Sequence, residues 1–203
     1  GGLSIRTRVR IRKMKRYSSD YLKFTELSQK KYKEYYKNRA EFAYAEDIIK
    51  YNEIATKSPF LPNNKVDVFT SGPDMLESLK KDLLSAKHSI NIEYYIFAKD
   101  STGKQIMDIL IDKAKQGVKV KLIYDSVGSL KTPRRFFRKL KKAGGRVAEF
   151  FPPLFHIRLI NLKINYRNHR KIVVIDGKIA YTGGINLRDD HMGKKKRLSP
   201  WRD

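Results

Sequence analysis

Residues 165–186 read Asn-Tyr-Arg-Asn-His-Arg-Lys-Ile-Val-Val-Ile-Asp-Gly-Lys-Ile-Ala-Tyr-Thr-Gly-Gly-Ile-Asn, and this stretch carries the clearest fold signal in the chain. Residues 172–175 form a β-branched run that is typical of a buried strand. Asp176 and Gly177 then indicate a hairpin turn, and residues 178–182 are expected to form the returning strand. The stretch therefore predicts a β-hairpin with a buried first strand.

Side chains that suit a phosphate group gather around this hairpin. His169 and Lys171 lie two residues apart, so in an extended segment their side chains share a face. Gly183 and Gly184 allow the backbone to approach a ligand closely, and Asn186 adds an amide. The cation neutralises a phosphate, the amide hydrogen-bonds it, and the imidazole attacks or protonates it. The alternative reading is an ordinary hairpin with a surface histidine.

The spacing of these residues matches a known signature. His169-x-Lys171-x4-Asp176-x6-Gly183-Gly184-x-Asn186 resembles the HxKxxxxD motif of the phospholipase D superfamily, with its trailing glycines and asparagine. Five further segments resemble bacterial cardiolipin synthases: residues 93–96, 117–120, 124–129, 166–168 and 201–203. The resemblance covers roughly residues 57–203.

The resemblance implies a reaction and a set of roles. In the family, the histidine of one motif attacks the phosphorus of a phosphodiester, and a covalent phosphohistidine forms. The histidine of a second motif protonates the leaving alkoxide and then activates the incoming alcohol. By resemblance His169 is the nucleophile, while Lys171 and Asn186 bind the non-bridging oxygens. Only one copy of the motif is present in this sequence.

Three further residues enter the site through the resemblance. Asp176 belongs to the catalytic motif, although its place at the turn also suits a structural role in closing the hairpin. Arg167 is expected to bind phosphate together with Gly183 and Gly184. Asp203 is expected to orient the nucleophilic imidazole, because the family places an acid beyond the glycine–asparagine segment. His88, His156 and His191 are expected at the surface.

The rest of the body alternates between strand and helix patterns. The expected strands are residues 66–70, 89–97, 118–125 and 146–150, and the expected helices are residues 74–87, 101–116 and 132–143. This order predicts an α/β layered fold, with a mostly parallel or mixed sheet flanked by helices and short right-handed crossovers. Functional side chains in such sheets gather at the carboxyl ends of the strands.

A basic arm precedes this body. Residues 3–16 alternate apolar and basic side chains without an acid, which favours a juxtamembrane position or, equally, a solvated charge run; the family resemblance favours the former. Residues 17–55 lack Gly and Pro and read as helix. The predicted domains are a helical arm over residues 1–56 and a truncated first catalytic half over residues 57–203. The start at Gly1 and the ending at Asp203 are interpreted as those of a fragment.

The composition limits the partners. The formal net charge is +24, and residues 57–203 contribute 31 basic and 14 acidic side chains. Such a charge attracts polyanions, either nucleic acid or an anionic membrane. The chain has no cysteine, which excludes disulfides and thiolate zinc sites. No metal or cofactor is expected, because the site's cation is Lys171.

The sequence leads to a main hypothesis and two alternatives. The main one is a piece of a cardiolipin synthase, which transfers a phosphatidyl group between two phosphatidylglycerols to give cardiolipin and glycerol. The resemblance implies phosphatidylglycerol and the membrane surface as partners, a second motif-bearing half or dimer mate, and the cytoplasmic face of the bacterial membrane; nucleic acid is not expected. The alternatives are a homodimeric nuclease of the superfamily and a non-catalytic basic module that binds membrane or nucleic acid.

Overall fold

The computed structural model describes residues 19–28, 30–31, 39–56, 58–62, 64–151 and 167–194. It divides into two units, Gly1–Asp67 and Val68–Asp203. Three expectations from the sequence lie outside the described residues: the basic run 3–16, the surface position of His156 and the acid Asp203. Each unit is described by itself.

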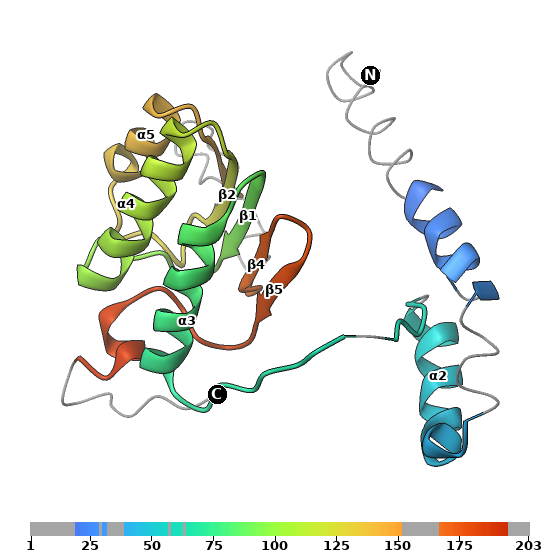
Figure 1. The fold of residues 1–203 in the computed structure, drawn as a ribbon. Helices are drawn as coiled ribbons and strands as arrows, with labels where there is room; N and C mark the ends of the chain where they lie inside the picture. Colours follow the sequence, from blue (N-terminus) through green and yellow to red (C-terminus); the bar gives the residue numbers. More distant parts are fainter. Residues whose placement is uncertain are drawn as a thin grey trace, which may run out of the picture. The chain divides into compact units, whose positions relative to one another are not determined.

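The second unit is built on a five-stranded mixed sheet (Figure 1). Its strands are β1 (Ser89–Tyr94), β2 (Lys119–Asp125), β3 (Arg146–Phe150), β4 (Ile172–Ile175) and β5 (Ile179–Thr182), in the spatial order β3-β2-β1-β4-β5. The pairs β1–β2 and β2–β3 are parallel, and the pairs β1–β4 and β4–β5 are antiparallel. The expected α/β fold and the motif hairpin are thus both confirmed.

Three helices pack side by side along this sheet: α3 (Gly72–Ser85), α4 (Ser101–Lys115) and α5 (Arg134–Lys142) (Figure 1). Since α4 and α5 connect successive parallel strands in one direction across the sheet, right-handed crossovers place both on the same face. The core lies between this helical layer and the sheet, and its fully buried side chains include Leu79, Leu83, Ile90, Ile106, Leu110, Leu122, Phe137 and Ile175.

Two details of the expected pattern are wrong. Residues 66–70 do not pair with the sheet, and Val66 and Val68 are 80% and 83% exposed. The alternation of apolar and polar side chains in this segment is typical of a strand. A strand also needs a neighbouring strand whose backbone groups are free to pair, and sequence periodicity does not show whether one is present. The strand expected over residues 89–97 ends earlier, since β1 covers Ser89–Tyr94.

The first unit is helical where it is described. Residues 19–28 and 30–31 are helical, a 3₁₀ segment η1 covers Ala40–Ala45, and α2 covers Glu46–Thr56. The helical expectation for residues 17–55 therefore holds over these ranges. No helix among the described residues of either unit has the length and apolarity needed to cross a bilayer.

Asp176 fixes the motif hairpin to the start of β1. Its Oδ1 accepts hydrogen bonds from the backbone N–H groups of His88 (2.8 Å) and Ser89 (2.7 Å), and its Oδ2 accepts one from Lys87 (2.8 Å). Backbone hydrogen bonds from Lys87 and Ser89 stabilise the charged form, and they lower the pKa of Asp176 from 3.8 to about 2. A positive φ of 52° at Asp176 and of 66° at Gly177 shapes the turn.

We predict that Asp176→Asn lowers the melting temperature, because an amide N–H₂ in place of one carboxylate oxygen leaves a backbone N–H without an acceptor. The folded-state pKa is depressed, so the carboxylate stabilises the fold fully above the ordinary pKa of 3.8 and loses this effect as the pH falls toward 2. Melting curves of both proteins should therefore converge over this acid range.

Asp108→Asn is the matched control, since Asp108 is an exposed carboxylate on α4. This change should leave the melting temperature unaltered at neutral pH. A difference between Asp176→Asn and the parent protein that stays constant down to the lowest pH would contradict the structural role of the charge.

Candidate active site

The proposed nucleophile lies at the carboxyl end of β1. His169 is exposed, and its ring stacks on the ring of Tyr95 with the centroids 4.0 Å apart and the planes 16° apart. Lys171 lies on the same aromatic ring, with its Nζ 5.8 Å from the centroid, and that Nζ donates to the carbonyl of His169 (2.7 Å). Tyr95 therefore brings the imidazole and the ammonium of the motif together.

Asn168 fixes the backbone immediately before the histidine. Its backbone N–H donates to Oδ2 of Asp125 (3.1 Å), and its side-chain amide donates to Oε1 of Glu93. The side-chain oxygen of Asn168 accepts from the N–H of Arg170 on the other side of the histidine (3.2 Å). Two carboxylates from adjacent strands thus hold the segment that carries His169.

Asp125 also positions the surface beneath Tyr95. This carboxylate is 1% exposed, and its Oδ1 accepts from the backbone N–H groups of Val127 and Gly128, both at 2.9 Å. A Cβ at Gly128 would lie 2.3 Å from the carbonyl oxygen of Tyr95 and 2.8 Å from two of its ring carbons. Gly128 therefore packs directly on Tyr95, and Asp125 links both sides of the Tyr95–His169 stack.

Asn186, which follows the hairpin, bonds to the backbone next to Tyr95. Its Oδ1 accepts from the N–H of Ile96 (3.0 Å), and its backbone N–H donates to Nδ1 of His191 (3.2 Å). Since Oδ1 is occupied, the orientation of the amide is fixed and Nδ2 remains as the donor for another group. His191 is 5% exposed, so the expectation that it lies at the surface is wrong. Its ring fills the space behind Asn186.

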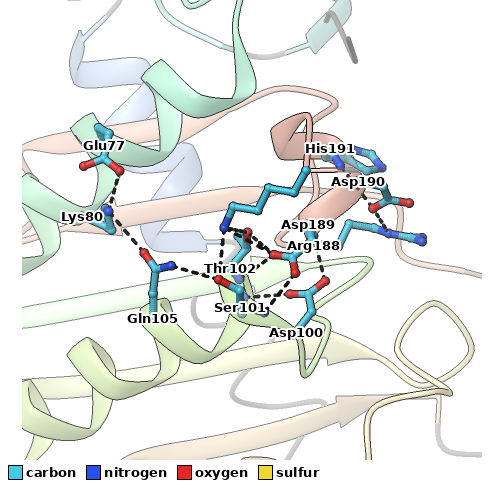
Figure 2. Close-up of polar contacts among 12 residues, drawn as sticks. Glu77, Lys80, Asp100, Ser101, Thr102, Gln105, Arg188, Asp189, Asp190 and His191 are labelled. Carbon is cyan, nitrogen blue, oxygen red and sulfur yellow. Dashed lines mark hydrogen bonds and ion pairs between the residues drawn. The ribbon is translucent and has the colours of Figure 1, made fainter. Parts of the chain in front are cut away.

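A network of carboxylates fastens the chain after Asn186 to the start of α4 (Figure 2). Asp189 accepts from the N–H groups of Ser101 (3.1 Å) and Thr102 (2.8 Å), and Asp100 accepts from the N–H of Asp189 (2.7 Å). Burial alone raises the pKa of Asp189, but hydrogen bonds from Thr102 and Ser101 and the charge of Lys194 outweigh it and lower that pKa. The network holds the Asn186 segment in place.

A pocket of about 480 Å³ adjoins the histidine. It is lined by Phe150, Arg167, Asn168, His169 and Arg170. Arg167 donates to the hydroxyl of Ser126 (3.4 Å), which in turn donates to the carbonyl of Phe151 (2.5 Å). Two guanidinium groups beside one imidazole make this pocket suitable for an anionic group.

The expected site residues do not all meet. His169 and Lys171 meet on the ring of Tyr95, the buried Asn186 is hydrogen-bonded to the backbone of the next residue, Ile96, and Arg167 lies in the pocket beside His169. Gly183 and Gly184 form the bend between β5 and Asn186. In the part of the chain that the structure describes, no cluster of three or more His, Cys, Asp or Glu side chains is arranged to hold a metal ion.

Asp176 requires a correction. It lies at the amino end of β1, whereas His169 lies at the carboxyl end, because β4 runs antiparallel to β1. A strand of four residues spans roughly 13 Å, and both carboxylate oxygens of Asp176 already accept backbone N–H groups. We therefore assign Asp176 a structural role in place of the catalytic one that the resemblance implies.

Sequence reasoning assigned no role to Glu93, Tyr95, Asp125 or Gly128, although it noted their segments as part of the family resemblance. One signal was available. Residues 93, 95 and 125 end two strands that were expected to be parallel neighbours, and functional side chains gather at that edge. The stacking of Tyr95 on the histidine could not be read from spacing, since 74 residues separate them.

The sequence is similar to those of known cardiolipin synthases. Residues 79–196 match the family model described as "Cardiolipin synthase, PLD-like domain". The major cardiolipin synthase ClsA of Bacillus subtilis is 43% identical over 168 residues, which are 83% of this chain and 34% of that protein. Cardiolipin synthase 1 of Staphylococcus epidermidis is 47% identical over 141 residues, 70% of this chain and 28% of that protein.

Among solved structures, NucT from Helicobacter pylori matches with a TM-score of 0.45 and 24% identity, covering 59% of this chain and 70% of that chain. The chain spans about a third of the length of the curated relatives that it matches. The family model itself covers more than half of the chain and includes every described residue of the site around His169. This chain therefore belongs to the phospholipase D-like domain family of the cardiolipin synthases.

Proposed function

We propose that the chain is the first catalytic half of a cardiolipin synthase, with residues 57–203 as its catalytic domain. The observation that carries the proposal is the meeting of His169 and Lys171 on the ring of Tyr95, with Asn186 hydrogen-bonded to the backbone of the next residue, Ile96. The identity to enzymes named cardiolipin synthase supports the substrate class. The reaction is phosphatidyl transfer from one phosphatidylglycerol to another.

The first step forms a covalent intermediate. A ring nitrogen of His169 attacks phosphorus, an N–P bond forms, and the P–O bond to the glycerol headgroup breaks. A second histidine, from another motif, protonates the leaving glycerol oxygen. In the second step the hydroxyl of another phosphatidylglycerol attacks phosphorus, loses its proton to that second histidine, and displaces His169. Two phosphatidylglycerols then give one cardiolipin and one glycerol.

The residues around the imidazole have distinct tasks in this proposal. Lys171 and Nδ2 of Asn186 bind the non-bridging oxygens as negative charge concentrates there. Arg167 draws the phosphate into the pocket, and the bend at Gly183 and Gly184 lets the backbone approach it. Tyr95 keeps the imidazole ring in one plane, so the attacking nitrogen needs little reorganisation.

Two parts of the proposal concern groups outside the described residues. The second motif comes from another half of the same protein or from a dimer mate. Asp203 is the proposed acceptor for the ring N–H of His169 that faces away from phosphorus.

The proposed location of the enzyme is the cytoplasmic face of the bacterial membrane, with residues 1–56 as a juxtamembrane arm.

We predict that His169→Ala in the full-length protein lowers the turnover of phosphatidylglycerol vesicles to cardiolipin by at least about 10³-fold, because the nucleophile is lost. Thin-layer chromatography of radiolabelled lipid measures the product. His88→Ala is the matched control: His88 is exposed near the amino end of β1, and its loss should change turnover less than about twofold.

The same proteins are incubated with plasmid DNA. Cleavage of the plasmid that His169→Ala abolishes, without cardiolipin formation by the parent protein, would replace the proposed function by that of a nuclease. Lipid turnover that survives His169→Ala would remove the catalytic assignment itself.

We also predict that Tyr95→Leu lowers kcat by about tenfold to 10²-fold with little change in KM, since the ring orients the imidazole. Tyr95→Phe keeps the stacked ring and should retain kcat within about threefold. Gly128→Ala should act like Tyr95→Leu, because the added Cβ displaces Tyr95. Steady-state kinetics and melting curves separate these effects from unfolding; an equal loss in Tyr95→Phe would contradict the role of stacking.

A further inference from the structure

The outer face of α5 carries charge of one sign. Its buried side chains are Phe136, Phe137 and Leu140. The exposed stripe on the opposite side, at helical spacing, consists of Arg135, Arg138, Lys139 and Lys142. Arg134 forms an ion pair with Glu149 (3.0 Å), but among the described residues no acidic side chain pairs with the four residues of the stripe. We call this stripe, together with the preceding Leu130 and Lys131, the α5 surface.

The other two helices of the same layer differ from α5. In α3 there are three acidic and two basic side chains, and in α4 two acidic and three basic ones. In contrast, α5 has six basic side chains and no acidic one within nine residues. Within the helical layer, the positive charge is therefore concentrated on one helix.

This concentration works against the stability of the helix. Like charges three or four positions apart repel each other, as Arg135 does with Arg138 and Lys139, and Arg138 with Lys142. Arg134 and Arg135 also lie in the first turn, where the helix dipole disfavours cations. An anionic surface against the stripe would relieve both effects.

Exposed apolar side chains lie in the loop that leads into α5. Leu130 is 65% exposed and Val127 is 39% exposed, and Lys131 next to them is exposed as well. This loop begins at Ser126, directly after Asp125, so it is continuous with the candidate site. A face that carries several basic side chains is attracted to the anionic headgroups of a membrane, and an exposed leucine near its amino end adds an apolar contact.

We propose that the α5 surface docks on an anionic lipid bilayer and brings the pocket beside His169 to the headgroups. The choice of a lipid partner rests on the proposed function. It is also favoured over nucleic acid because the aromatic rings of α5 are buried, so none is available to stack on bases. The contact is electrostatic and peripheral, and Leu130 adds an apolar contact.

The first test measures binding of the 203-residue chain to vesicles by co-sedimentation. The vesicles contain phosphatidylcholine with or without about 30 mol% phosphatidylglycerol. The stripe variant combines Arg135→Gln, Arg138→Gln, Lys139→Gln and Lys142→Gln. Because each basic residue near an anionic leaflet raises binding about fivefold, the variant should bind at least about tenfold more weakly. Binding of the parent protein should require phosphatidylglycerol and weaken with added salt.

The matched control removes the same charge from other exposed positions of this unit: Lys81→Gln, Lys87→Gln, Lys104→Gln and Lys178→Gln. It should stay within about threefold of the parent protein, because none of these four lysines belongs to the α5 surface. Both variants keep the basic residues of the first unit. Equal losses in the two variants would mean that net charge alone governs binding, which overturns the proposal.

The second test locates the contact directly. The chain has no cysteine, so Leu130→Cys and, as control, Lys178→Cys each give one labelling site for an environment-sensitive fluorophore. Phosphatidylglycerol vesicles should shift the emission of the probe at position 130 to the blue and leave the probe at position 178 unchanged. No shift at position 130, or equal shifts at both, overturns the proposal.

Competition with duplex DNA separates the two kinds of polyanion. Loss of DNA binding in the stripe variant, with vesicle binding intact, would overturn the proposal in favour of a nucleic-acid surface. These tests need no turnover, so they are independent of the proposed reaction. Vesicle binding lost in the stripe variant, together with lipid turnover that survives His169→Ala, would leave the docking surface standing and remove only the catalytic assignment.

Discussion

The buried carboxylate of Asp125 is the constraint on which the candidate site depends. It is almost inaccessible to solvent, and it accepts three backbone N–H groups from two separate segments, residues 127–128 and residue 168. A buried charge of this kind persists only when its hydrogen bonds are satisfied. Satisfying them fixes the glycine beneath Tyr95 and the asparagine before His169 at once. The imidazole of His169 is thus positioned by the ring of Tyr95, which packs against Gly128, and by the backbone of Asn168.

Much of the fold could be predicted because its signals are local. β-branched runs, helical apolar stripes and the Asp176–Gly177 turn each report the structure of their own segment, and the sheet and its hairpin follow from them. What failed depends on partners far away in the sequence. Val66 and Val68 alternate as a strand does but pair with no neighbouring strand. His191 lies in a polar stretch of sequence, between two aspartates and a run of lysines, but is buried behind Asn186.

The site follows the same division. His169, Lys171 and Asn186 belong to a spacing that can be recognised in the sequence, and the structure brings them to one edge of the sheet. Tyr95, Glu93 and Asp125 hold that edge together, yet each acts on a residue more than 40 positions away. Such contacts arise from strand order, β1 between β2 and β4, which no pattern within a single segment encodes.

The position of Asp176 explains the length of the spacing within the motif. The four unspecified residues between the lysine and the aspartate are Ile172–Ile175, and they are the whole of β4. The motif therefore spans the length of one strand. His169 lies at the end of the strand where the candidate site is, and Asp176 holds the hairpin to β1 at the other end. Deleting or inserting one residue directly after Lys171 would shift the register of β4 and turn the buried Val173 and Ile175 away from the core, so the width of the sheet sets this spacing.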